Sequence, residues 1–387
     1  MAARNNMKAI IAIDSFKGSL SSLEAGHAAR RGILKVFPNA DVTVLRGADG
    51  GEGTASALTE GMGGTVVKAA VTGPLGETLT AEYGIIGGST AVMEMASAAG
   101  LPMVPEELRD PMVTTTYGVG EMIRDAIGRG CRSFIVGIGG SATNDCGIGM
   151  LSALGFRFLN ADGTPVCRGA RDLCEVTSID ISGAMPELPE CTFKVACDVK
   201  NPLCGPLGCS AVFAPQKGAS PESISIMDAA LSRFARLTSE VVEGADPDYP
   251  GSGAAGGLGF AFRSYLSAEL CPGVDIVLDA VGLDEKLSGA ELVITGEGKL
   301  DSQTVMGKAP AGVAAAAARA GVPVIAVSGI VSEDAAECNA HGIDAFFPIL
   351  RRIVTAEEAM RCDAAARNLT DTVEQIMRVF AINYKEI

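Results

Sequence analysis

The stretch that decides the fold is Phe134-Ile135-Val136-Gly137-Ile138-Gly139-Gly140-Ser141-Ala142-Thr143-Asn144-Asp145. An apolar run precedes a glycine turn, and an apolar, helix-like segment follows it. This order predicts a strand, a turn rich in backbone N–H groups and the start of a helix. Successive N–H groups and the positive end of a helix favour anions, and phosphate above all. The stretch therefore indicates an α/β protein with a phosphate cradle.

Two further glycine loops carry acidic residues, at 47–54 (Gly-Ala-Asp-Gly-Gly-Glu-Gly-Thr) and at 296–301 (Gly-Glu-Gly-Lys-Leu-Asp). Phosphate cradles beside carboxylates that can bind a metal point to phosphoryl transfer. No stretch matches the P-loop pattern Gly-x-x-x-x-Gly-Lys-Ser/Thr. The Gly-x-Gly-x-x-Gly match at 251–256 follows a turn-rich segment instead of a strand, so it does not predict a dinucleotide site. It is either an anion site or a place of close packing.

The 387 residues are 48% hydrophobic and carry a formal charge of −15. This length predicts two domains by default and leaves room for a third. An acidic surface repels nucleic acid and anionic lipid, so neither is an expected partner. A small anionic substrate is compatible with the charge, because local N–H groups and a few lysines outweigh distant acids. The oligomeric state is not determined by the sequence.

The eleven cysteines are spread from Cys131 to Cys362 without a Cys-x-x-Cys pair. The N-terminus shows no secretory signal, so we do not expect a disulfide framework. We expect reduced, mostly buried thiols in a cytoplasmic protein. No apolar run approaches the ~20 residues that span a membrane.

The two ends of the chain share a parallel βα pattern. Strands are expected at 7–13, 41–45, 291–295, 322–327 and 345–349, with helices between them. In the middle, 65–71, 78–86 and 90–95 alternate like antiparallel strands, and the turn at 160–163 predicts a hairpin. Neither end alone offers enough strands for a stable sheet. We therefore expect a discontinuous parallel-sheet domain, 1–66 with 286–387, and an inserted mixed α/β domain, 67–285.

Seven acidic residues occupy similar positions, at strand ends or at glycine turns. Three of them follow or end an apolar strand, and four lie in or just after glycine turns: Asp14, Asp198 and Glu297, then Asp49, Glu52, Asp145 and Asp301. Ligands of open α/β sheets bind beyond the carboxyl ends of the strands, so these acids can converge on one cleft. Helix capping explains any single one, but it is a poor account of all seven.

Three lysines occupy similar settings. Lys308 precedes an Ala-rich helix, where a lysine is electrostatically unfavourable unless an anion is present. Lys17 follows the first strand, and Lys217 is either functional or a solvated surface lysine. His27 and His341 are the only histidines, so carboxylates must serve as any base.

These blocks resemble the type 1 glycerate kinase family, the bacterial glycerate 2-kinases. The resemblance runs in order through 14–20, 48–54, 139–145, 197–203, 213–219, 253–259 and 295–308. It implies ATP-dependent phosphorylation of D-glycerate to 2-phosphoglycerate with Mg²⁺. It also implies a flavodoxin-like domain interrupted by a domain with a restriction-endonuclease-like core, with the active site in the cleft between them. Cys146 and Cys209 depart from the family's small residues, and we expect from them altered packing and an oxidation-sensitive loop.

With the resemblance, each candidate receives a role. Asp49 or Glu297 is the expected base, and Lys17 or Lys308 binds the substrate carboxylate or the γ-phosphate. Substrate contacts are expected from Asp14, Ser15, Lys17, Glu52 and Gln303, and metal contacts from Asp145, Asp198 and Asp301. ATP is expected at Gly139, Gly140, Ser141, Asn144, Lys217, Gly253, Gly256 and Gly257. A kinase for a related sugar acid, 3-phosphoglycerate as the product, and a non-catalytic glycerate sensor are the alternatives.

Overall fold

The apolar run after the first residues forms strand β1 (Lys8–Ile13), at the centre of a parallel sheet. The computed structural model describes residues 7–46 and 53–384. Two compact units are present, Met1–Asp49 with Val274–Ile387 (the first unit) and Gly50–Gly273 (the second unit). The first unit is thus discontinuous in sequence.

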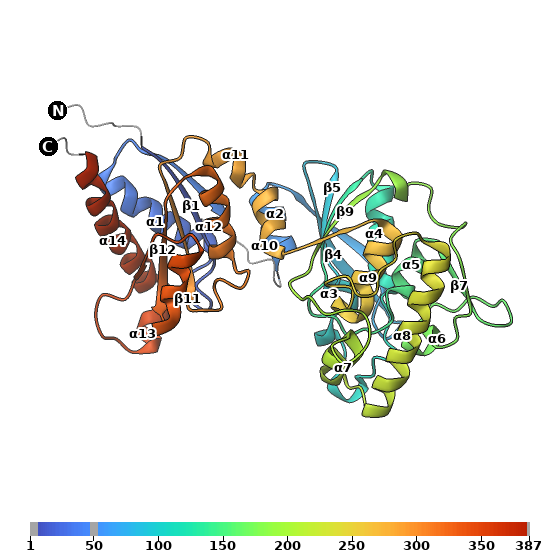
Figure 1. Cartoon of the computed structure of the whole chain (residues 1–387). Coiled ribbons are helices and arrows are strands. Elements are labelled where there is room, and N and C mark those ends of the chain that lie inside the picture. The colour runs from blue at the N-terminus through green and yellow to red at the C-terminus, as the bar shows by residue number, and fades with distance from the viewer. Residues whose placement is uncertain (1–6, 47–52, 385–387) are drawn as a thin grey trace. The chain divides into compact units, whose positions relative to one another are not determined.

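The first unit alternates strands and helices (Figure 1). Its elements are β1, α1 (Ser22–Val36), β2 (Asp41–Arg46), α10 (Gly273–Ala280), α11 (Leu283–Leu287), β11 (Leu292–Leu300), α12 (Ala309–Ala320), β12 (Val324–Val331), β13 (Ala345–Pro348), α13 (Ala356–Met360) and α14 (Cys362–Phe380). The five expected strands are confirmed. Strand β11 is longer than predicted, so Glu297 lies inside it and not at its end.

The sheet of the first unit has the order β13-β12-β11-β1-β2, with every neighbouring pair parallel. Alternate residues of a strand point to opposite faces, and β1 is apolar on both. Ile11 and Ile13 pack in the cluster that contains α1 and α14, whereas Ile10 packs in the cluster with α12. Helices therefore cover both faces, which explains the continuous apolar pattern of the strand.

Strands β1 and β11 are adjacent in the sheet, although residues 14–291 lie between them in the sequence. The chain proceeds from β1 to β2 on one side, and from β11 to β13 on the other. The Asp14 backbone N–H donates a 2.8 Å hydrogen bond to the Gly296 carbonyl oxygen, which ties the two strand ends together. In open α/β sheets this reversal of strand order is where ligands bind.

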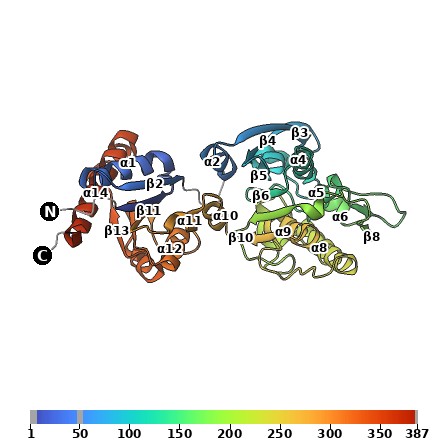
Figure 2. The same ribbon diagram turned by 90° about the horizontal axis from the view of Figure 1, so that it is seen from above.

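The second unit contains the other elements. They are α2 (Thr54–Gly61), β3 (Thr65–Thr72), β4 (Thr78–Ile86), β5 (Thr90–Glu94), α3 (Ala96–Ala99), α4 (Tyr117–Gly128), β6 (Ser133–Gly137), α5 (Ile148–Ala153), β7 (Arg157–Leu159), α6 (Gly169–Leu173), β8 (Ser178–Asp180), β9 (Thr192–Ala196), α7 (Cys209–Phe213), α8 (Pro221–Val241), α9 (Ala254–Leu266) and β10 (Glu269–Cys271). Figure 2 shows α8 and α9 side by side, and Thr238 and Tyr265 join them by a 2.9 Å hydrogen bond.

The sheet of the second unit has the order β10-β9-β6-β5-β4-β3 and is mixed. Strands β3, β4 and β5 pair antiparallel, as predicted, and β5, β6, β9 and β10 pair parallel. The predicted hairpin at 160–163 needs correction. The turn itself is present, because the Asn160 N–H donates to the Thr164 carbonyl oxygen and Leu159 forms an antiparallel bridge to Pro165. The segment that begins at Pro165 is not a regular strand, and β7 pairs with β8.

The unit boundaries fall at 49/50 and 273/274, whereas the sequence-based boundaries lay at 66/67 and 285/286. Helix α2 belongs with the second unit, because the Ala55 N–H at its start donates to Glu94 Oε1 at the end of β5. Helix α10 belongs with the first unit, because Val274 and Leu278 pack in the α12 core. No helix in the described parts of the chain is both long and apolar enough to span a membrane.

Candidate active site

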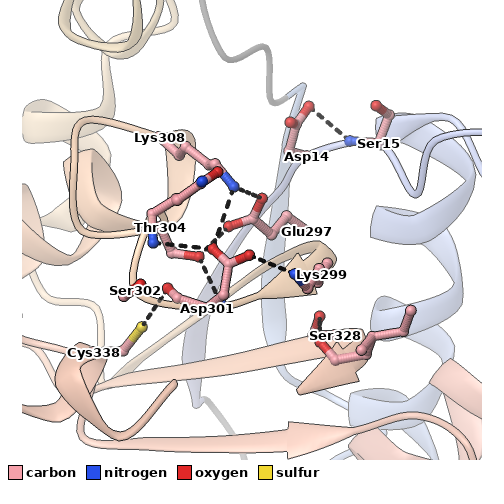
Figure 3. A network of polar contacts seen from close by, with 12 residues as sticks. Asp14, Ser15, Glu297, Lys299, Asp301, Ser302, Thr304, Lys308, Ser328 and Cys338 are labelled. Atoms are coloured by element: carbon pink, nitrogen blue, oxygen red, sulfur yellow. Dashed lines mark hydrogen bonds and ion pairs between the residues drawn. The ribbon is translucent and has the colours of Figure 1, made fainter. Parts of the chain in front are cut away.

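Glu297 is the buried centre of a polar network in the first unit (Figure 3). It projects from β11, and only 8% of its surface is exposed. Its Oε1 accepts a 2.7 Å hydrogen bond from the Thr304 hydroxyl, and its Oε2 lies 3.4 Å from Lys308 Nζ. Burial raises the pKa of the Glu297 carboxyl above its ordinary value, while Thr304 and Lys308 oppose that shift. A carboxylate with a raised pKa is suited to accept a proton near neutral pH.

Asp301 lies just after β11 and is engaged by two lysines. Lys299 Nζ is 2.9 Å from Asp301 Oδ2, and Lys308 Nζ is 3.7 Å from Oδ1. The hydrogen bond from Lys299 is the main cause that lowers the pKa of the Asp301 carboxyl. The Gln303 backbone N–H also donates to Oδ1. Lys308 thus bridges Glu297 and Asp301 at the N-cap of α12. The sequence predicted an anion beside this lysine, and the two carboxylates supply negative charge there.

A pocket of about 680 Å³ opens beside this network. The β1–α1 loop contributes Asp14, Ser15 and Lys17, and Glu297 and Lys308 line the same pocket. Asp14 is buried, and its Oδ1 accepts from the Ser15 N–H. The structure therefore brings these five candidate residues together at one pocket. Gln303 is exposed and does not line the pocket; it contributes its backbone N–H to Asp301.

The glycine loop that follows β6 borders a separate cavity of about 540 Å³ in the second unit. Gly139, Gly140 and Ser141 line this cavity together with Lys217. The Lys217 ammonium donates 2.7 Å hydrogen bonds to Ser141 Oγ and to the Thr143 carbonyl oxygen. Only 2% of Lys217 is exposed. Of the two alternatives that the sequence allowed, a functional lysine and a solvated surface lysine, the second is therefore excluded.

Lys217 has no carboxylate within ion-pair distance among the residues that the structure describes. Burial lowers the pKa of its ammonium from 10.5 to about 8, and the nearby charge of Asp145 opposes this. A buried charge without an ion pair is costly in an apolar environment. An anion in the adjoining cavity would remove part of that cost.

Asp145 and Asn144 are buried within the loop and do not line the cavity. Asp145 accepts from the Thr116 N–H and hydroxyl and from the Gly147 N–H, which holds the loop to the start of α4. Burial raises the pKa of the Asp145 carboxyl. This arrangement argues against the metal role expected for Asp145. Asn144 donates to Ser210 Oγ instead of facing a ligand.

The glycines at the start of α9 pack directly on the same loop. Ala255, Gly256 and Gly257 all have positive φ angles. A Cβ on Gly256 would lie 2.1 Å from the Thr143 carbonyl oxygen, and the Cys146 N–H donates to the Gly256 carbonyl. The structure therefore favours close packing over ligand contact for Gly253, Gly256 and Gly257, none of which lines the cavity.

Two acids complete the lining of this cavity. Asp198 is exposed, and its Oδ1 accepts from the Gly273 N–H. Glu94, at the end of β5, lines the cavity too and was not singled out from the sequence. Its position at a strand end is the same signal that identified Asp14 and Asp198. Thr304 in the first unit was likewise missed as a site residue.

The five acids that the structure describes therefore divide between the units. Asp14, Glu297 and Asp301 lie in the first unit, and Asp145 and Asp198 lie in the second. Asp49 and Glu52 fall outside the described residues. No group of three or more His, Cys, Asp or Glu side chains is arranged to hold a metal within residues 7–46 and 53–384.

An α/β protein with acids and lysines at the ligand-binding edge of a parallel sheet is typical of enzymes that act on small anions. A sequence model of the glycerate kinase family matches residues 9–381, so the chain belongs to this family and is a kinase. It is 47% identical to glycerate kinase of Bacillus subtilis (strain 168) over 382 residues, which are 97% of this chain and 100% of that protein.

Two further similarities cover nearly the whole chain. Glycerate 2-kinase of Escherichia coli (strain K12) is 46% identical over 379 residues, covering 96% of this chain and 99% of that protein. A crystal structure of a protein assigned as glycerate kinase 2 from Salmonella typhimurium LT2 matches with a TM-score of 0.87 and 45% identity. That match covers 98% of this chain and 100% of the other.

Proposed function

We propose that this protein uses ATP to phosphorylate D-glycerate to 2-phosphoglycerate. The observation that carries the proposal is the buried Glu297 carboxylate beside Lys308 at the ligand-binding edge of the parallel sheet. A kinase that acts on a hydroxyl needs a base for the hydroxyl proton and cations for the transferred phosphoryl group. The relatives' names support the substrate, and the name of the Escherichia coli relative supports phosphorylation of the 2-hydroxyl.

In this proposal Glu297 accepts the proton of the glycerate hydroxyl. Burial raises the pKa of its carboxyl, so Glu297 binds a proton more readily than an exposed glutamate does. Lys308 and Lys17 bind the γ-phosphate or the glycerate carboxylate from the same pocket. Asp14 and Ser15 accept and donate hydrogen bonds to the remaining groups of the substrate. Asp49 stays an alternative base, outside the described residues.

Magnesium fits these residues as a partner of ATP and not as a resident ion. Mg²⁺ is usually held by one or two carboxylates together with substrate phosphates, which agrees with the lack of a larger ligand cluster among the described residues. Asp301 or Asp198 would hold it. When bound, it neutralises charge on the phosphates. Asp145 is left out, because its carboxylate is occupied by Thr116 and Gly147.

The cavity of the second unit is proposed to bind a phosphate or carboxylate group. Lys217 supplies the positive charge and Ser141 supplies a hydroxyl. Gly139 and Gly140 have no side chain, so the anion can approach their backbone closely. The proposal keeps the anion-binding role that the sequence predicted for the loop. It no longer includes Asn144 and the glycines at the start of α9 among the residues that contact the anion.

We also propose the finer description of the fold. Counted along the first unit, the order β2-β1-β11-β12-β13 is 2-1-3-4-5, which is the order of flavodoxin-like domains. The mixed sheet of the second unit is compatible with a restriction-endonuclease-like core.

The experiment compares Glu297→Gln with Asp49→Asn in an ATP-consumption assay across short hydroxy acids. The true base should lose kcat by about 10²–10⁴ with little change in KM. Glu82→Gln, an exposed glutamate paired with Lys68, is the control and should remain active. Phosphorus NMR of the product identifies the hydroxyl. Wild-type kcat in both variants would disprove the assignment of the base, and no turnover of glycerate by the native protein would disprove the function.

A further inference from the structure

The pocket of the first unit is lined by two chemically different sets of side chains. One set is charged and consists of Asp14, Lys17, Glu297, Lys299 and Lys308. The other set is apolar, is called the apolar wall here, and consists of Ile330, Ile349, Leu350, Ala359 and Met360. A three-carbon hydroxy acid has no apolar group of any size to place against such a wall, and it fills a small part of about 680 Å³.

Three large side chains of the apolar wall are open to solvent. The exposed fractions are 56% for Ile330, 37% for Leu350 and 47% for Met360. Exposed apolar side chains scattered singly need no explanation, but a group that lines one pocket marks a binding surface. The wall belongs to three separate places in the chain, β12, the segment after β13, and α13.

The wall is held in place by short contacts to the loop that carries Lys17. A Cβ on Gly18 would lie 2.6 Å from the Met360 methyl carbon, so that methyl group packs against the loop at this glycine. The Cys362 thiol donates to the Ser19 carbonyl oxygen, which anchors the start of α14 to the same loop. The apolar wall and the loop that carries Lys17 are therefore joined in one pocket.

We propose that the apolar wall binds the purine base of the nucleotide, with the phosphates directed to Lys17 and Lys308. This inference rests on the proposed kinase function and specifies which ligand the pocket takes. A nucleotide combines the same two chemistries as the pocket lining, because a flat apolar ring is joined to a polyanion. Methionine is flexible and its thioether makes favourable contacts with aromatic rings, so Met360 is suited to the face or edge of a purine. The lysines of the charged set match the charge of the phosphates.

The test measures calorimetric binding of Mg²⁺–ADP and of Mg²⁺–pyrophosphate to the native protein and to the double variant Leu350→Ser/Met360→Ser. Pyrophosphate lacks the base, so the difference between the two ligands reports the contribution of the purine. The native protein should bind ADP more tightly. The double variant should lose about tenfold or more in ADP affinity and keep its affinity for pyrophosphate.

The matched control is Val379→Ser/Ile382→Ser. These apolar side chains are 68% and 59% exposed, belong to the first unit and do not line the pocket. ADP affinity should not change in this variant. Equal loss of both ligands in the wall variant, or unchanged ADP affinity, would overturn the purine assignment even if glycerate is phosphorylated. A smaller sedimenting mass with unchanged ADP affinity would assign the wall to a contact between two copies of this chain, which would also overturn it.

Discussion

The Thr304 hydroxyl donates its only proton to Glu297 Oε1 at 2.7 Å, and it accepts a 3.2 Å hydrogen bond from the Asp301 N–H. Thr304 is fully buried. Because its proton is committed, Thr304 holds Oε1 as an acceptor and leaves Oε2, beside Lys308, as the oxygen for proton transfer. We interpret Thr304 as a positioning residue for the proposed base.

Replacing Thr304 by valine should move the pH profile of kcat/KM. The hydrogen bond favours the charged carboxylate and so lowers the pKa of Glu297. Without it the pKa rises further, and since a base must be deprotonated to act, the acidic limb of kcat/KM should shift to higher pH. Thr304→Ser keeps the hydroxyl and should restore the native profile. A uniform loss of activity with an unshifted acidic limb would indicate a purely structural role.

Anion binding by the second unit should weaken as the pH rises through about 8, where the free Lys217 ammonium loses its proton. The sign follows from the positive charge, which is present below that pH and absent above it. Tripolyphosphate and D-glycerate are titrated separately between pH 7 and 9, and the ligand whose affinity falls identifies the group that Lys217 binds. Lys217→Met should bind that ligand weakly, without this pH dependence.

Lys68→Met serves as the control for Lys217, because Lys68 is exposed and pairs with Glu82 in the same unit. It should retain the native affinities at every pH. If Lys217→Met binds both ligands as the native protein does, the anion site is disproved.

Gly256→Ala should destabilise the second unit by about 3 kcal/mol or more. Its φ of +68° is strained for alanine, and the new Cβ would lie 2.1 Å from the Thr143 carbonyl oxygen. Gly163→Ala is matched in φ, at +75°, but meets nothing within 4 Å. It should cost only about 1–2 kcal/mol. Urea unfolding measures both, and equal losses would contradict the close packing of α9 on the glycine loop.

Cys146 and Cys209 should resist thiol reagents in the folded protein, contrary to the oxidation-sensitive loop expected from the sequence. Both are fully buried, and burial raises the pKa of the Cys209 thiol to about 12 and that of Cys146 well above its ordinary value. The reactive thiolate is therefore scarce. Mass spectrometry after brief labelling should find the exposed Cys362 modified first. Rapid labelling of Cys146 in the native state would contradict this.

Most of the strands of the first unit could be predicted from the local pattern of apolar residues in the sequence. A strand buried on both faces is apolar at nearly every position, so β1 and the first halves of β11 and β12 were visible as apolar runs. Acids that follow such runs are expected at one edge of a parallel sheet. This expectation grouped Asp14 with Glu297, and the structure has both in the lining of one pocket. Residues 54–66 were harder to assign, because the partner of α2 is Glu94, distant in sequence.

The glycine loop after β6 shows what the local sequence pattern can predict and what it cannot. Its residue types predicted a strand, a turn and an anion site, since glycine freedom and N–H density are properties of the chain itself. Which side chain faces the cavity is decided by burial and by partners far away in sequence. Lys217 reaches Ser141 across 76 residues, Asp145 is bonded to Thr116, and Gly256 touches Thr143, so only the folded packing separates ligand contacts from structural ones.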